Sequence, residues 1–390
     1  MVTPCFPLSG KYDTLPLDMK HPIKYGLTIS IIMLALAGCL LFSGHGAESN
    51  TSAEKMQQVS DHFNGEQYFN PGYQQSLPGQ QPKRSGWIWR WIFRNDWPEW
   101  PEVKGSLPGP LPVERVPVGT LRITPVGHAT FLIQIDELNI LTDPIWSDRC
   151  SPVSWAGPRR HKEPGIRFED LPPIDAVLVS HNHYDHLDLV TLRRLAERGT
   201  RRSLVTLGNF RLVQGVGIPI IEELDWWQSV QLSPNVSVTL VPAQHFSSRT
   251  PWDRNKTLWG SFVISGPSGN VFFAGDTGYG PHFQEIAHRF SPIKVAILPI
   301  SPFRPQQSNE PPHEHRPGVH MGPAEAVQAH IDLRAHVSIA SHFQIFQIGS
   351  DGFYDAVNEL AFTLKERNLK PDVFIAPDPG LAQEFTTHSF

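Results

Sequence analysis

Cysteine is scarce in this chain, with only Cys5, Cys39 and Cys150 among 390 residues. Their spacing fits neither a disulfide framework nor a cysteine-based zinc site. The formal net charge of −5 argues against a protein that binds nucleic acid over a broad surface. Internal repeats are also lacking. Histidine, by contrast, is abundant at 18 residues, and a subset of these residues stands in a metal-like context.

The one long apolar run, residues 25–42, follows Lys20, His21 and Lys24. A positive start, an apolar middle and small residues at the end are typical of a secretory signal. The segment Leu36-Ala37-Gly38-Cys39 has the form of a bacterial lipoprotein cleavage box. We therefore expect acylation of Cys39 to hold the chain at the membrane of a bacterial cell envelope, outside the cytosol. An uncleaved membrane helix is the alternative for residues 1–42.

Residues 43–114 are expected to form a polar tether and then an extension rich in tryptophan and proline. Trp87, Trp89 and Trp91 alternate with apolar and basic residues, and Trp97 and Trp100 follow. Two interpretations remain open for this stretch. Trp and Arg together suit a membrane interface, whereas large indole rings are more often buried against a folded domain.

From residue 121 the pattern changes to short apolar runs separated by turns, which is typical of strands. The runs at 121–123, 131–135 and 139–142 are expected to lie in one sheet. Further strands are expected at 176–180, 203–207, 236–241, 261–265, 271–274, 295–298, 337–340 and 373–376, and helices from about 187 and at 282–289, 323–332 and 354–367. Strands interspersed with helices predict an α/β layered domain over residues 115–390.

The most informative motif is His181-Asn182-His183-Tyr184-Asp185-His186, which directly follows an apolar run. His181 and His183 are two residues apart, so from an extended segment they can point the same way. Asp185 and His186 can face a second metal. Nitrogen and oxygen ligands from one short turn are how a zinc-type site is built without cysteine.

The motif needs further ligands, because a catalytic zinc takes about three protein ligands and keeps an open position. Three other expected strands also end in histidine or aspartate: His245, Asp276 and His342 follow the strands at 236–241, 271–274 and 337–340. Ligands of open sheets gather outside strand ends. We therefore expect these three side chains to join the histidine-rich turn.

These residues and their surroundings resemble the metallo-β-lactamase superfamily, and within it the N-acyl-phosphatidylethanolamine phospholipase D family. The resemblance covers about residues 121–342 and extends to segments without expected ligands. Examples are Gly127-His128-Ala129-Thr130, Leu258-Trp259-Gly260-Ser261 and Ala274-Gly275-Asp276-Thr277-Gly278-Tyr279. It implies an αββα sandwich, in which helices flank two mixed β-sheets.

The resemblance also implies two zinc ions per chain. The ligands of one would be His181, His183 and His245, those of the other Asp185, His186 and His342, and Asp276 would bridge them. His320 matches a histidine that the family places near the reacting phosphate. The catalytic residues would then be Asp185, which orients the water, together with Asp276 and His320.

The implied reaction is hydrolysis of N-acyl-phosphatidylethanolamine, or a related phospholipid, to phosphatidic acid and the free head group. Its partners would be membrane phospholipid and the membrane surface. Two alternatives stay open: a metallo-hydrolase of another ester, such as a lactone or a soluble phosphodiester, and a metal-binding envelope protein without catalysis. The oligomeric state is open as well, with a homodimer as one alternative.

Other polar residues near these motifs are expected to serve the structure. We expect His128 to fix a turn and Asp143 to brace the ligand loops by hydrogen bonds. His313 and His315 lie in a proline-rich stretch and are expected at the surface. That stretch, residues 301–319, is longer than the resemblance leads us to expect, so head-group and acyl-chain preference stay open.

Overall fold

The computed structural model describes residues 60–71, 97–101, 103, 109–303 and 318–386. The chain divides into two compact units, Met1–Thr51 and Ser52–Phe390, and every described residue belongs to the second. The expected anchor at residues 25–42 and the segment with Trp87, Trp89 and Trp91 lie outside the described residues. Among the described residues, no helix combines the length and the apolar character that crossing a bilayer requires.

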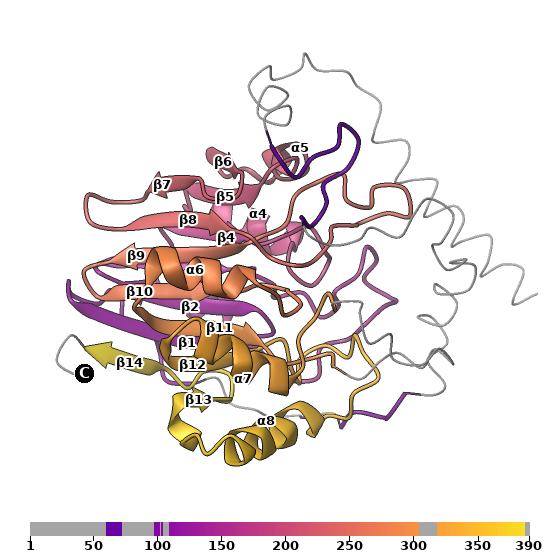
Figure 1. Ribbon diagram of the computed structural model, residues 1–390. Helices are drawn as coiled ribbons and strands as arrows, with labels where there is room; N and C mark the ends of the chain where they lie inside the picture. Colours follow the sequence, from indigo (N-terminus) through magenta and orange to yellow (C-terminus); the bar gives the residue numbers. More distant parts are fainter. Residues whose placement is uncertain (1–59, 72–96, 102, 104–108, 304–317, 387–390) are drawn as a thin grey trace, which may run out of the picture. The chain divides into compact units, whose positions relative to one another are not determined.

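Two mixed sheets, each of seven strands within the described residues, form the centre of this unit (Figure 1). The first sheet has the order β14-β1-β2-β3-β4-β5-β6. Its strands are β1 (Thr120–Gly127), β2 (Thr130–Ile135), β3 (Leu138–Thr142), β4 (Ala176–Val179), β5 (Arg202–Thr206), β6 (Ile220–Leu224) and β14 (Gln383–Thr386). The second has the order β13-β12-β11-β10-β9-β8-β7. Its strands are β7 (Ser229–Gln231), β8 (Ser237–Val241), β9 (Ser261–Gly266), β10 (Gly269–Phe273), β11 (Ile293–Pro299), β12 (Ala335–Ser341) and β13 (Phe374–Ile375).

Strand β11 shows why these apolar runs form buried strands. All seven of its residues are buried. Val295 and Ile297 face the first sheet in the core between the sheets, whereas Ala296 and Leu298 face the helices on the outer side. Alternate side chains of a strand point to opposite faces, so a strand covered on both faces is apolar on both. In β11 the exception is Lys294, next to the start of the strand.

Helices cover the outer faces of both sheets. Helices α6 (His282–Phe290), α7 (Pro323–Asp332) and α8 (Asp355–Glu366) pack on the second sheet, and α4 (Leu189–Glu197) and α5 (Phe210–Val213) pack on the first. This arrangement confirms the predicted αββα sandwich. The helix expected from about residue 187 begins at Leu189, because the Asp188 side chain accepts a hydrogen bond from the Val190 N–H and caps it.

Residues 60–71 pack against the domain for which the sequence predicts a start at residue 115. Tyr68 is only 1% exposed and belongs to the core between the sheets. The His62 ring stacks on Trp226 at a centroid distance of 3.9 Å. The boundary at residue 115 stays a prediction, but this upstream segment contacts the same core as the strands.

Candidate metal centre

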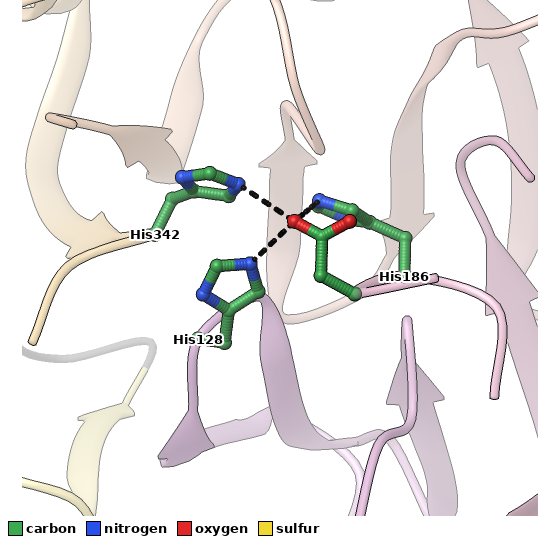
Figure 2. A group of neighbouring side chains, drawn as sticks. His128, His186 and His342 are labelled. Atoms are coloured by element: carbon green, nitrogen blue, oxygen red, sulfur yellow. Dashed lines mark hydrogen bonds and ion pairs between the residues drawn. The ribbon is translucent and has the colours of Figure 1, made fainter. Parts of the chain in front are cut away.

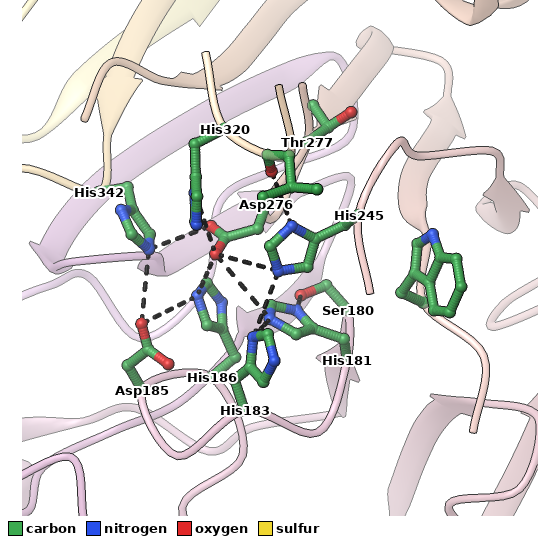
Figure 3. Close-up of polar contacts among 12 residues, drawn as sticks. Ser180, His181, His183, Asp185, His186, His245, Asp276, Thr277, His320 and His342 are labelled. Carbon is green, nitrogen blue, oxygen red and sulfur yellow. Dashed lines mark hydrogen bonds and ion pairs between the residues drawn. The ribbon is translucent and has the colours of Figure 1, made fainter. Parts of the chain in front are cut away.

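The candidate site lies where four strands end. Strand β4 leads into His181 and His183, and β8, β10 and β12 lead into His245, Asp276 and His342. Strands β8 and β10 are both antiparallel to β9, and β10, β11 and β12 are parallel. Strands β8, β10 and β12 therefore point the same way, and their ends meet at one edge of the second sheet. The structure thus brings all seven expected ligands together (Figure 3).

The first group of side chains consists of His181, His183, His245 and Asp276. Nε2 of His181 and Nε2 of His245 lie 2.8 Å and 3.2 Å from Nδ1 of His183. Oδ2 of Asp276 lies 3.9 Å from Nε2 of His181 and 3.6 Å from Nε2 of His245. Three imidazole nitrogens and one carboxylate oxygen therefore converge, and nitrogen and oxygen ligands of this kind suit zinc.

The second group gathers around Asp185. Nε2 of His186 and Nε2 of His342 lie 3.4 Å and 3.5 Å from its Oδ2. The same two nitrogens lie 3.2 Å and 3.1 Å from Oδ2 and Oδ1 of Asp276. His128 completes the group, with Nε2 3.0 Å from Oδ2 of Asp185 (Figure 2). Asp276 therefore contacts histidines of both groups.

Backbone carbonyls orient two of the rings from behind. Nδ1 of His245 donates to the Val319 carbonyl at 2.7 Å, and Nδ1 of His342 donates to the Ser301 carbonyl at 2.7 Å. A ring that donates from Nδ1 presents Nε2 to the centre. Such outer partners are what fixes the tautomer of metal-binding histidines.

Asp143 orients two more rings. It accepts hydrogen bonds from the Ser180 N–H at 2.7 Å, the Ser180 hydroxyl at 2.6 Å and Nδ1 of His186 at 2.7 Å. Because the Ser180 hydroxyl donates to Asp143, its oxygen accepts from Nδ1 of His181 at 2.9 Å. The expectation that Asp143 braces the ligand loops by hydrogen bonds is confirmed, and both rings turn Nε2 inward.

Two negative charges are buried in the cluster. Burial raises the pKa of Asp185 and of Asp276, but the neighbouring imidazoles, His186 above all, outweigh burial and hold both pKa values well below the usual range. Burial lowers the pKa of His342 and of His186, but the nearby Asp276 and Asp185 outweigh it. They raise the pKa of His342 to about 9 and that of His186 well above its usual value. The carboxylates thus require compensating positive charge, which either protons or metal ions supply.

The unsatisfied atoms of the cluster fit divalent metal ions. Nε2 of His186, Nε2 of His342, Oδ1 of Asp276 and Nδ1 of His320 are buried and make no hydrogen bond with any described residue. Buried polar atoms are almost always paired. Ligand atoms of the right chemical type therefore face one another, and a cation would satisfy them all.

His320 lies on a short strap, residues 318–320, which crosses the metal centre. The Gly318 carbonyl accepts a hydrogen bond from Nε2 of Gln244 at 2.7 Å. Nδ1 of His320 lies 3.7 Å from Oδ2 of Asp276, and its side chain is 21% exposed, whereas those of His181, His186, His245 and His342 are at most 1% exposed. His320, like the half-buried His183, is therefore a ring that a substrate can reach. His313 and His315 lie outside the described residues.

Asn70 is a site residue that no sequence motif marks. Its Nδ2 donates to the His245 carbonyl at 2.9 Å, and its Oδ1 accepts from the Trp259 indole at 3.1 Å. The same indole also donates to the Ala243 carbonyl at 2.9 Å. The segment 60–71 thus holds the backbone that carries His245.

We expect Asn70→Ala to weaken metal retention on the order of tenfold or more, as loss of an outer partner does at metal sites. The loss of two hydrogen bonds should also lower the free energy of unfolding by about 1–2 kcal/mol. Metal titration and thermal unfolding would measure both. Gln67→Ala is the matched control, because Gln67 loses one hydrogen bond, 2.9 Å to the Arg254 carbonyl, away from the metal loop. Equal metal affinity in the two variants would contradict the role of Asn70.

Comparison with known proteins identifies the family. A family model described as a β-lactamase superfamily domain matches residues 138–343. The N-acyl-phosphatidylethanolamine-hydrolyzing phospholipase D 1 of Caenorhabditis elegans is 32% identical over 300 residues, which are 72% of this chain and 82% of that protein. An uncharacterized protein of Mycobacterium tuberculosis is 38% identical over 265 residues, 67% and 68% of the two chains.

The fold agrees with solved structures. A metallo hydrolase from the archaeon Ignicoccus hospitalis aligns with a TM-score of 0.50 at 22% identity, covering 68% of this chain and 98% of that one. Fold and site together define a metal-dependent hydrolase. The chain belongs to the metallo-β-lactamase superfamily and is related to the N-acyl-phosphatidylethanolamine-hydrolyzing phospholipases D.

Proposed function

We propose that the chain is a phospholipase D-type phosphodiesterase, which hydrolyses N-acyl-phosphatidylethanolamine or a related glycerophospholipid to phosphatidic acid and the free head group. One observation carries the proposal: seven ligand-type side chains and the reachable His320 meet in one cluster (Figure 3). Relatives named for this activity, from Caenorhabditis elegans and Saccharomyces cerevisiae, are each 32% identical to the chain and support it.

The proposed cofactor is a pair of zinc ions. His181, His183 and His245 would hold one ion, and the other would be held by a second set of three residues, with Asp276 shared. That second set is Asp185, His186 and His342. When bound, two such ions supply an activated water and offset the charge that grows on the phosphate oxygens.

The chain's own residues complete the reaction. His128 occupies Oδ2 of Asp185 at 3.0 Å, which leaves Oδ1 to orient the attacking water. The water oxygen bonds to phosphorus, the bond from phosphorus to the head-group oxygen breaks, and the proton that the water gives up is balanced by the proton that the leaving oxygen gains. His320, beside Asp276 and open to solvent, is placed to donate a hydrogen bond to the phosphate or a proton to the leaving oxygen.

The proposed location is the bacterial cell envelope, with the chain anchored through acylated Cys39 or an N-terminal helix. The support is the sequence pattern that ends in Leu36-Ala37-Gly38-Cys39. An anchored enzyme would meet its phospholipid substrate at the membrane surface, which is the proposed partner.

Product analysis in ¹⁸O-water tests the function. The full chain, loaded with zinc, would be offered N-acyl-phosphatidylethanolamine, phosphatidylethanolamine and phosphatidylcholine in mixed micelles, beside a lactone and a soluble phosphodiester. We expect phosphatidic acid that carries one ¹⁸O in its phosphate, detected by mass spectrometry, and two zinc ions per chain by elemental analysis. Diacylglycerol as product, or turnover of only the lactone or the soluble ester, would reject the proposal.

A further inference from the structure

We propose that two loops at the rim of the metal centre, residues 246–257 and 147–158, dock on an anionic lipid bilayer through Trp252 and Trp155. The inference deepens the proposed function and rests on it, since a phospholipid must be reached from its bilayer. It differs from the expected N-terminal anchor, because it assigns a docking face to the folded domain itself.

Trp252 stands at the tip of a closed loop and is 68% exposed. Oδ1 of Asp253 accepts hydrogen bonds from the backbone N–H groups of Arg249 and Thr250 at 2.9 Å and 2.8 Å. The base of the loop is closed by the Asn255 N–H, which donates to the Ser247 carbonyl at 2.8 Å. The loop therefore has internal bonds that hold its shape, and that shape presents a large indole ring to the outside.

Trp155 stands in a second loop and is 56% exposed. The Cys150 N–H donates to the Pro158 carbonyl at 3.2 Å, and Arg149 and Arg159 form a β-bridge across the loop. Exposed tryptophan is expensive unless it has a partner, because its large apolar ring lies in water. Two exposed indole rings on braced loops offer apolar surface to a partner that is itself part apolar and part polar.

Tyr184 places both loops beside the metal centre. The Arg249 guanidinium lies 3.9 Å from the centre of the Tyr184 ring. Tyr184 also packs against the cluster that contains Ile145 and Cys150, at the base of the other loop. Tyr184 itself lies between His183 and Asp185 in the chain. The two loops project on the side of the sheets at which β8 ends (Figure 1).

The chemistry of the loops favours lipid as the occupant. An indole ring is apolar with one polar N–H, and it concentrates where hydrocarbon meets water. The Arg249 guanidinium is turned inward, where it donates to the Asn182 and Leu187 carbonyls at 2.9 Å. Residues 246–257 also carry the basic Arg254 and Lys256 against the acidic Asp253, so the rest of the loop still has a net positive charge. Positive segments are attracted to anionic head groups. A bilayer that covers this rim would bring phosphate groups to the metal centre.

A fluorescent label tests the docking without any catalysis. In the full chain with Cys5→Ser and Cys39→Ser, a nitrobenzoxadiazole label would be placed at Trp252→Cys or, as the control, at Phe362→Cys. Phe362 is 59% exposed on α8, and the remaining Cys150 is buried. With vesicles of phosphatidylcholine and phosphatidylglycerol, the fluorescence emission of the label at 252 should shift to the blue and be quenched by brominated lipid. The emission of the label at 362 should change in neither way.

Three results would overturn the docking proposal. One is a chain that does not bind these vesicles, and another is a vesicle-bound chain whose label at 252 stays in water. The third is a label shielded equally without vesicles as protein concentration rises, which would assign this face to a second copy of the chain.

A kinetic comparison separates failure of docking from failure of the proposed function. Trp155→Ala combined with Trp252→Ala should raise KM for N-acyl-phosphatidylethanolamine in vesicles on the order of tenfold, as loss of interfacial affinity does, and leave a soluble phosphodiester unaffected. Ile331→Ala with Phe362→Ala, both exposed on helices away from the rim, is the control. Unchanged vesicle kinetics with intact lipid hydrolysis would reject docking alone. A quenched label at 252 in a chain that hydrolyses no lipid would reject the function alone.

Discussion

Asp276→Asn should abolish hydrolysis and strip the site of metal, while the fold remains. Asp276 is the carboxylate that both histidine groups share, with Nε2 of His186 at 3.2 Å and Nε2 of His342 at 3.1 Å. An amide keeps the shape of the side chain but loses its charge. Metal ions contribute several kcal/mol to stabilising a charged transition state, and a loss of about 4 kcal/mol lowers the rate about 10³-fold.

Elemental analysis, steady-state kinetics and circular dichroism measure the three parts of this expectation. Asp372→Asn is the surface control, because Asp372 is exposed in a short 3-10 helix, Pro371–Val373, that carries none of the expected ligands. A D276N protein that retained full activity would favour a non-catalytic, metal-binding role. A D276N protein that retained its metal but lost turnover would instead show that Asp276 acts in the reaction and is not needed to hold the metal.

The sequence predicted the strands that are buried on both faces, and it predicted the site at their ends. Strand β4 and residues 295–298 of strand β11 appear in the sequence as short, wholly apolar runs, and both strands are fully buried. Ligand-type residues follow the strand runs at His181, at the end of β4 in the first sheet, and at His342, at the end of β12 in the second, and both strand ends meet at the site. The local sequence pattern was sufficient to predict these strands and ligands, because the burial of a strand and the position of the residue that follows it both depend on that pattern.

Three of the four strands at the sheet edges were not predicted; the fourth, β13, was expected at 373–376. β6, β7 and β14 each lie at the end of a sheet order, and their residues mix polar and apolar types. Strand β7 has only three residues, with two of them exposed. An edge strand needs little hydrophobic burial, so its sequence carries a weak pattern.

The outer contacts of the site were only partly predictable. Asp143 was identified because it follows a strand in a recognisable segment. Asn70 was not, because its hydrogen bond to the His245 carbonyl joins residues 175 positions apart and no motif surrounds it. The backbone at His128, Asp143 and His342 has φ values of 58°, 34° and 63°, a region costly for residues with a side chain. Such strain gathers at functional sites and depends on tertiary contacts that the sequence does not display.

Gly278→Ala should damage both the strap and the metal centre, because the added Cβ would overlap the backbone carbonyl of Gly318. The strap is held at this point by Gln244 and by the hydrogen bond from Nδ1 of His245 to the Val319 carbonyl at 2.7 Å. Backbone cannot rotate away as a side chain can, so the strap must move. His320 would move with it, and a misplacement of about 1 Å at a reacting group costs on the order of 10²-fold in rate.

Loss of the two strap hydrogen bonds, at about 1 kcal/mol each, should also lower the unfolding free energy of Gly278→Ala. One of the two is the bond from His245 to the Val319 carbonyl, so metal affinity should fall as well. Gly215→Ala is the matched control: the same methyl group there meets nothing within 4 Å, so its stability and kinetics should stay close to those of the unchanged chain. Thermal unfolding, metal titration and kcat on a soluble phosphodiester compare the two. If Gly278→Ala behaved like Gly215→Ala, the strap would not depend on close approach at residue 278, and the position of His320 would need another explanation.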